Sequence, residues 1–449
     1  MIRAGIQAAR ELGGLTRELP DLRVIAGAGM LGAVGAGLLN PVLSLHLASR
    51  GLDVGRIGLM FTLGSLLPVV LQPALGALSD RMGRRGILLG VYLSTSLLVP
   101  ALALLTDPLP LAAALCARLM LDRSVAPLRA AAVADSAPPA RRAMVFGWLA
   151  SFTNLVLVGA MVGSSLTVAW VGTRGTLAVA GAFFFASSLA WLGLRGGGPA
   201  ALAREPGAVA PGAARGEREG REQRERRGKR GLAQIAASLA APLRDARRDP
   251  VLAALVVYQF CFVFALDAFP IYLPLFAVHL GVPQAWVGPL IASSWLVFAL
   301  VQPVGGRLAD RGRDRTPWIL GGLTGMAVCA ALLGVAGWIA APYALPLLAV
   351  AWIAMAIPDG LSRPAVEARV VDQAPPAERG RFLGVLGAAA ALANVLAPVS
   401  YGALARRAGP HATFLLSAVA LCAALLAMDR VRARARTADP SLTSLTRDS

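Results

Sequence analysis

The stretch that decides the fold occurs twice in this chain. GLDVGRIGLMFTLGSLLPVVLQPALGALSDRMGRR runs from residue 51 to residue 85, and GVPQAWVGPLIASSWLVFALVQPVGGRLADRGRDR runs from residue 281 to residue 315. Aligned without a gap, the copies match at pairs that include Gly58/Gly288, Gln72/Gln302, Pro73/Pro303, Gly76/Gly306, Leu78/Leu308, Asp80/Asp310 and Arg81/Arg311. Upstream, PVLSLHL ending at Leu47 pairs with PLFAVHL ending at Leu280, and downstream VADSAPPARRAMVFG from Val133 pairs with VVDQAPPAERGRFLG from Val370. Three blocks in the same order predict two homologous halves.

The composition is that of a membrane protein. Of the 449 residues, 56% are hydrophobic and only 15% are charged, with a mean hydropathy of +0.64, whereas soluble domains carry about 25% charged residues. Apolar runs such as 86–105 and 318–341 have the length of transmembrane helices, because about 20 residues at 1.5 Å each cross the hydrocarbon. The first run, 22–47, is too long for a cleaved signal and is interpreted as a retained helix.

We therefore predict an all-α membrane protein, with twelve transmembrane helices in two pseudo-symmetric six-helix bundles. The spans are expected near 22–47, 54–77, 86–106, 109–133, 143–170, 175–194, 250–280, 284–308, 317–340, 343–371, 380–405 and 411–428. The predicted organisation is an N-terminal tail 1–21, a first bundle 22–194, a linker 195–249, a second bundle 250–428 and a C-terminal tail 429–449. The linker contains GEREGREQRERRGKR, a mixed-charge segment too polar to fold alone, and a short amphipathic piece near 232–243.

The arginine distribution indicates orientation rather than a nucleic-acid partner. The net charge is +18, but the arginines lie between the apolar runs and follow no continuous face. If the N-terminus is cytoplasmic, the loops ending in Arg85, Arg142, Arg315 and Arg381 are cytoplasmic too, and the other face keeps only Arg50, Arg56, Arg174, Arg406 and Arg407. We expect a multi-pass protein in contact with membrane lipid, with both termini in the cytoplasm. The near absence of lysine is typical of a GC-rich genome, so a bacterial source and a bacterial cytoplasmic (inner) membrane are expected.

Neither a cofactor nor a metal site is predicted. The four cysteines lie inside apolar runs, with no Cys-x-x-Cys or Cys/His spacing, at Cys116, Cys261, Cys329 and Cys422. No Walker sequence occurs, so transport driven by ATP is not expected. The chain is not expected to be an enzyme.

The loop GALSDRMGRR and its copy GRLADRGRDR resemble the signature of the major facilitator superfamily, which lies between helices two and three and, degenerate, between helices eight and nine. The second copy lacks the inner glycine. The resemblance implies a cytoplasmic gate in which acidic and basic groups pair between helices and separate during switching. The gate residues it implies are Gly76, Asp80, Arg81, Gly83, Arg84, Arg85, Asp135, Asp310, Arg311, Arg315 and Asp372. The alternative is that these arginines only obey the positive-inside rule.

Charged residues inside the spans are concentrated on three helices. A charge at the membrane centre costs about 2.5–3.5 kcal/mol on insertion scales, so such residues mark functional sites by default. They are Arg118, Asp122, Arg123 and Arg129 on helix four, Asp267 on helix seven, and Asp359, Arg363, Glu367 and Arg369 on helix ten. The resemblance implies that helices one, four, seven and ten line the central cavity. Glu367 and Arg369 lie near the cytoplasmic end and are interpreted as gate or interface residues.

Asp267 is the sharpest candidate in the cavity. It lies near the middle of helix seven, three residues before Pro270, with no charged partner on its own helix. Burial favours the protonated form of a carboxyl group, so Asp267 is a candidate proton carrier. The alternative is a structural ion pair with Arg118 or Arg123.

Other candidates have weaker signals. Arg118 and Asp122 lie four residues apart and can pair on one helical face. Arg118 resembles an arginine of proton-coupled family members, although those usually have glycine four residues later. The uncharged candidates Asn40, Tyr258 and Gln259, with Asn154 and Asn394, could orient a polar substrate or bond a neighbouring helix. His46 and His279 match by repeat and are expected to be interfacial.

The leading hypothesis is a monomeric secondary transporter that exports a small organic compound in exchange for protons by alternating access. Uptake or facilitated passage of a metabolite is the alternative, since helix five reads LVGAMVGSSL and lacks the proline typical of drug–proton antiporters. A membrane sensor or scaffold is the remote alternative, against which the cavity charges argue.

Overall fold

The computed structural model describes residues 19–66, 84–137, 142–194, 250–311, 315–373 and 379–438. Throughout these ranges the regular structure is helical, and no strand occurs in them. The predicted linker 195–249, its amphipathic piece and most of both tails lie outside the described residues.

The first half consists of helices whose described boundaries lie close to the predicted ones, while the end of the second span lies outside the described residues. They are α2 (Pro20–Ser49), the helix Val54–Leu66, α4 (Arg84–Leu104), α5 (Pro108–Ser136) and α6 (Arg142–Trp191). Proline stands in the first turn of α2 and α5, where its missing N–H costs no helical hydrogen bond. α6 contains two predicted spans, which meet at Gly172 in a backbone conformation with φ 70° that favours glycine.

The second half repeats this pattern. Its helices are α10 (Pro250–Leu266), α11 (Ala268–His279), α12 (Gln284–Arg311), α13 (Thr316–Val335) with the short 3₁₀ turn Ala336–Trp338, α14 (Ala341–Gln373), α15 (Arg379–Ala408) and α16 (Ala412–Ala438). α10 and α11 form one predicted span that is interrupted at Asp267.

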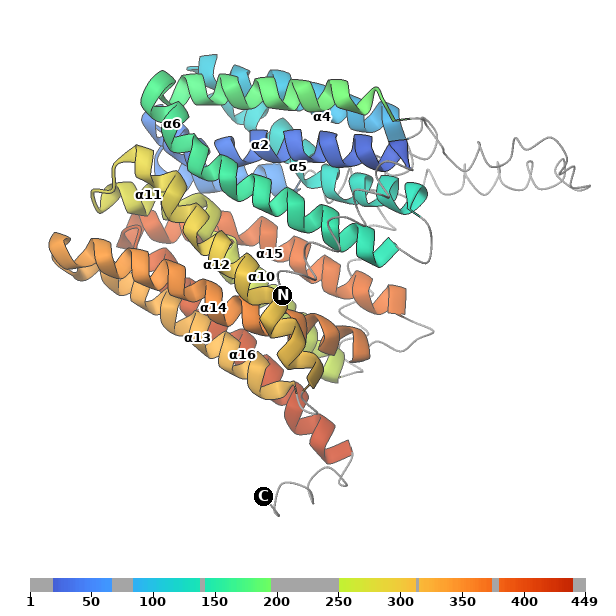
Figure 1. Ribbon diagram of the computed structural model, residues 1–449. Helices are drawn as coiled ribbons and strands as arrows, with labels where there is room; N and C mark the ends of the chain where they lie inside the picture. Colours follow the sequence, from blue (N-terminus) through green and yellow to red (C-terminus); the bar gives the residue numbers. More distant parts are fainter. Residues whose placement is uncertain are drawn as a thin grey trace, which may run out of the picture.

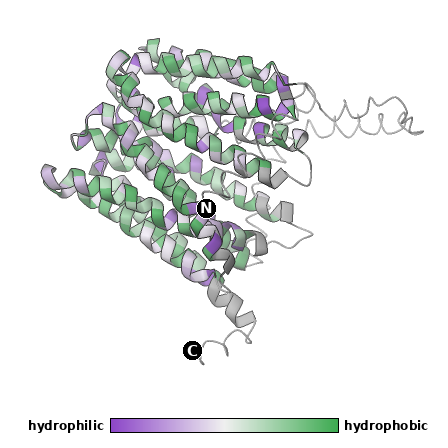
Figure 2. Ribbon diagram, viewed as in Figure 1, coloured by the Kyte–Doolittle hydropathy of each residue, from purple (hydrophilic) through white to green (hydrophobic). Residues whose placement is uncertain are grey.

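The described helices have the length and surface of membrane spans. Nine of them are long and apolar enough to cross a membrane, and hydrophobic residues run along their length (Figure 2). Large apolar side chains face outward, such as Leu97 at 67% exposed and Leu300 at 66%, as a protein in a hydrocarbon solvent requires. Only Val54–Leu66 of the second span is described, so the count of twelve stays a prediction for that span.

Two features of the structure add detail to the sequence expectations. The last span was expected near 411–428, and the candidate membrane span is Ala412–Val431. The helix α16 itself continues to Ala438, because its alanines and arginines are strong helix formers and no proline or glycine interrupts them. His46, which was expected to be interfacial, lies in the last turn of α2 and is 1% exposed, and its Nε2 lies 3.0 Å from the carbonyl oxygen of Leu102. That carbonyl belongs to the last turn of α4, where the helix leaves it without a partner.

Among the described helices, the closest packing between the two halves lies near one membrane face. We call the face where α2 begins and α16 ends the terminal face, and the other the opposite face. Near the opposite face α12 packs against α6 and α11 against α2. There Thr62 donates a hydrogen bond to the carbonyl of Val395 (2.8 Å) and accepts one from the N–H of Val399 (3.0 Å). α6 and α12 diverge toward the terminal face (Figure 1).

The repeated glycine pair Gly58/Gly288 is explained by this contact. A Cβ atom on Gly58 would lie 2.3 Å from the carbonyl oxygen of Pro398, and one on Gly288 would lie 2.2 Å from that of Met161. Each glycine therefore lets a helix of one half approach the backbone of the other half more closely than any side chain permits.

We expect Gly288→Ala to destabilise the closed contact at the opposite face, because its methyl group has no room. Overpacking of this kind costs about 1–3 kcal/mol, which should lower the thermal unfolding temperature of the purified protein in detergent. Gly321→Ala is the matched control, since a Cβ there meets nothing within 4 Å. Equal unfolding temperatures for the two variants would contradict this explanation of the glycine pair.

Candidate functional site

A cavity of about 420 Å³ lies between the two halves. One wall comes from the first half, through Asn40 on α2 and Asn154 and Met161 on α6. The other wall comes from α11, α12 and α14 of the second half, and its lining includes Phe269, Trp295, Phe298, Trp352, Asp359 and Arg363. The cavity therefore has walls from both halves, as a site exposed alternately to each face requires.

A second cavity of about 440 Å³ adjoins the first and lies within the second half. Its lining includes Tyr258, Gln259, Asp267, Glu367 and Asn394. Leu266 and Arg363 line both cavities, so the two spaces share a wall. The sequence candidates Asn40, Tyr258 and Gln259 thus all reach these cavities, together with Asn154 and Asn394.

Asp267 lies at the break between α10 and α11. Three residues later, Pro270 has no N–H to donate to the carbonyl of Leu266, which removes one hydrogen bond from the helix at this point. Oδ1 of Asp267 lies 3.8 Å from Nη2 of Arg123 on α5, and the two side chains are 13% and 32% exposed. Oδ2 is buried and finds no hydrogen-bond partner among the described residues. The expected partner from another helix is therefore Arg123 and not Arg118.

Arg118 pairs along its own helix instead. Its Nη2 lies 3.4 Å from Oδ1 of Asp122, one turn later on α5. The arginine side chain is 3% exposed and the aspartate side chain 49% exposed. Neither residue lines the two cavities described above. The helix α5, which is the fourth predicted span, reaches the site through the contact of Arg123 with Asp267.

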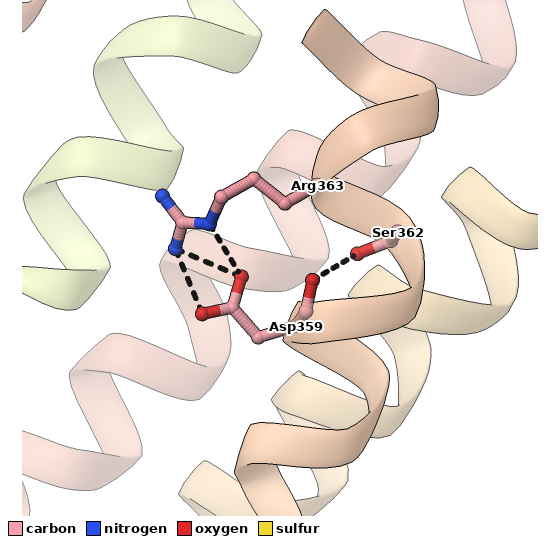
Figure 3. A network of polar contacts seen from close by, with 3 residues as sticks. All are labelled: Asp359, Ser362 and Arg363. Atoms are coloured by element: carbon pink, nitrogen blue, oxygen red, sulfur yellow. Dashed lines mark hydrogen bonds and ion pairs between the residues drawn. The ribbon is translucent and has the colours of Figure 1, made fainter. Parts of the chain in front are cut away.

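Asp359 and Arg363 form the tightest polar contact in the cavity (Figure 3). Nη2 of Arg363 lies 2.7 Å from Oδ2 and 2.8 Å from Oδ1 of Asp359, and Nε lies 3.1 Å from Oδ1. The guanidinium carbon also lies 5.4 Å from the ring centre of Phe262 and 5.2 Å from that of Phe298. Pairing and two aromatic faces together offset the cost of removing this charge from water.

The sequence reasoning missed the aromatic walls. Phe262, Trp295, Phe298 and Trp352 line the two cavities, and Nε1 of Trp352 donates to the carbonyl of Leu290 at 3.0 Å. The only signal available was the spacing of Tyr258 and Phe262, whose rings stack with centres 5.5 Å apart. Aromatic residues are equally common on lipid-facing surfaces, so their number on a span does not indicate which face they occupy.

Most of the predicted cytoplasmic gate falls beyond what the structure describes. Gly76, Asp80, Arg81 and Gly83 lie outside the described residues, and the side chains of Arg84, Asp135, Asp310, Arg311 and Asp372 are not described either. Arg85 is exposed in the first turn of α4, and Arg315 directly precedes α13. The pairing of these groups stays a prediction.

The bundle of membrane helices around a charged, aromatic cavity defines a membrane transport protein. The Major Facilitator Superfamily profile matches residues 25–340 and 290–446. The chain therefore belongs to this superfamily.

Known proteins similar to this chain are transport and resistance proteins. Over 167 residues it is 31% identical to the class B tetracycline resistance protein of Escherichia coli, a match that spans 36% of this chain and only 39% of that relative. The fold is similar to that of a mutant of the nucleoside transporter NupG, with a TM-score of 0.71 and 12% identity over 91% of this chain and 99% of that one. It is also similar to a bacterial homolog of the human lysosomal transporter Spinster in an inward-facing conformation, with a TM-score of 0.66 and 15% identity over 92% and 96% of the two chains.

We expect Arg123→Gln to destabilise the protein, because it leaves the buried carboxylate of Asp267 without its ionic partner. The cost of such a buried group is about 1–3 kcal/mol, seen as a lower thermal unfolding temperature in detergent. Adding Asp267→Asn should restore most of the loss, since the neutral amide needs no counter-charge. Arg23→Gln, an exposed arginine of α2, serves as the control. If the double variant is no more stable than the single one, the two residues do not act as a pair.

Proposed function

We propose that the protein is a secondary active transporter that exports a small organic compound from the cytoplasm in exchange for protons. The observation that carries the proposal is the ion pair between Arg123 of α5 and Asp267 at the α10–α11 junction. It joins one half to the other at the edge of a cavity. A contact of this kind can hold the halves together in one state and release them in another.

Protonation of Asp267 would provide the release. The neutral acid no longer attracts Arg123, so the ionic contact between the halves is lost when the proton binds. The free Oδ2 atom gives an arriving proton a place that no other described group occupies. The break in the helix at this residue lets α10 and α11 tilt separately, because fewer backbone hydrogen bonds resist the bend.

We place the entry of substrate at the terminal face, on the expected orientation of the chain. The arginine distribution favours a cytoplasmic terminal face in a bacterial inner membrane, and α6 and α12 diverge toward that face (Figure 1). Substrate would therefore enter from the cytoplasm, between the aromatic and acidic groups of the cavity walls. The tetracycline resistance relative supports export, although only over part of the chain. The predicted gate at Asp80, Arg84, Asp135 and their counterparts would close this face in the second state.

Uptake or facilitated passage of a metabolite is the second candidate. It is favoured by the uninterrupted sequence LVGAMVGSSL in α6, which lacks the proline typical of drug–proton antiporters. A transporter without proton coupling would carry a compound in either direction, according to the concentration gradient of that compound. The two candidates differ in whether substrate movement releases protons.

We expect everted membrane vesicles energised by respiration to release protons when a transported compound is added, with tetracycline and a panel of organic amines and acids as probes. The readout is recovery of quenched acridine fluorescence. Asp267→Asn should abolish the release, because the amide carries no proton. Asp53→Asn, an exposed acid at the opposite face, should leave it unchanged.

Two results would contradict the export proposal. Proton release that persists at the full rate in Asp267→Asn would remove the role of this carboxyl group. Probe movement through the wild-type protein without any proton release would favour facilitated passage.

A further inference from the structure

A separate cavity of about 310 Å³ opens near the opposite face, away from the central site. It lies where α2 and α4 end and where the second segment of α6 begins after Gly172. Two arginines line it, Arg50 and Arg174, and the remaining lining includes the apolar residues Pro100, Ala103, Leu104 and Ala178. No carboxylate belongs to the lining.

The two arginines are not neutralised by acids in the part of the chain that the structure describes. Arg50 donates a hydrogen bond to the carbonyl of Ala103, and its Nε lies 3.5 Å from Nε2 of His46. Arg174 is exposed, and within the described residues it makes no ion pair. By contrast, Arg56 at the same face pairs with Asp53 at 3.2 Å. Two guanidinium groups on one cavity wall favour an oxyanion, above all phosphate, as ligand.

The surroundings of the cavity identify the source of this phosphate. Leu104 on the rim is 80% exposed, and Leu97, two turns earlier on α4, is 67% exposed. α4 and the second segment of α6 lie at the outer edge of the first half, away from the second half (Figure 1). The cavity therefore faces the lipid at the level of the helix ends, where phospholipid headgroups lie. A free anion in water would gain nothing from the apolar rim, whereas an acyl chain would.

The alignment that pairs Gly51 with Gly281 places Leu280 opposite Arg50. The second half thus has no arginine at this position, although His279 lies in the last turn of α11. We propose that Arg50 and Arg174 bind the phosphate of a membrane phospholipid whose acyl chains lie along α4.

Native mass spectrometry of the purified full-length protein, titrated with phosphatidylglycerol in detergent, tests this proposal. Arg174→Gln is the decisive variant, because this side chain supports no described contact and its loss should not disturb folding. We expect its apparent lipid affinity to fall by about fivefold, as for one arginine at a headgroup. Arg174→Glu should lower it further by charge reversal. Arg407→Gln, an exposed arginine at the same face outside this cavity, is the matched control and should bind as the wild type does.

Two further ligands test whether the bound phosphate belongs to a lipid or is a free anion. Diacylglycerol, which lacks the phosphate, should bind with equally low affinity to the wild type and to Arg174→Gln. Inorganic phosphate should not compete with phosphatidylglycerol at millimolar concentration. Unchanged lipid affinity in both Arg174 variants would contradict a phosphate site at this cavity. Equal affinity of the wild type for diacylglycerol and phosphatidylglycerol would show that the cavity binds acyl chains without recognising the phosphate, which also contradicts the proposal. Effective competition by inorganic phosphate would overturn the assignment to lipid.

Discussion

A charge inside a membrane bundle must be matched by another charge, and this constraint organises the centre of the protein. In two of the described ion pairs both partners belong to the same helix. These are Arg118 with Asp122 on α5 and Asp359 with Arg363 on α14. Pairs of this kind neutralise each helix whatever the neighbouring helices do. Asp267 differs, because its described ionic partner, Arg123, belongs to the other half. The free-energy cost of burying the charge of Asp267 therefore depends on the relative position of the two halves.

This difference separates the stable parts of the site from the part that can switch. Arg363 is fixed by a bidentate carboxylate and two aromatic rings, so it forms a rigid wall between the two cavities. Asp267 has one long ionic contact and one free oxygen at a break in its helix. A proton or a substrate that changes the charge of this residue would change the energy of the contact between the halves.

Much of the architecture could be predicted from the sequence, because the membrane limits the choices. The helix positions follow from apolar length, and the internal repeat indicates two related halves. The candidates Asp267, Asn40, Tyr258 and Gln259 reach the cavities because polar groups on a span seldom face lipid. The aromatic walls could not be predicted, since Phe298 and Trp352 are as compatible with lipid as with a cavity. The burial of His46 depends on a carbonyl at the end of another helix, which no local pattern reveals. The choice of Arg123 over Arg118 likewise depends on tertiary packing.

The central claim is that the site is reached from one face at a time, and that the contact near Thr62 and Val395 closes the opposite face. Thr62→Cys and Val395→Cys, with the four native cysteines replaced by alanine, allow this contact to be locked by a short thiol cross-linker. The same protein carries Gln259→Cys, whose access from each face is probed with an impermeant thiol reagent. Labelling of this cysteine is read by mass spectrometry of its own peptide. The account predicts labelling from both faces in the unlocked protein and from the terminal face alone once the cross-link is formed. Continued labelling from the opposite face in the locked protein would contradict it.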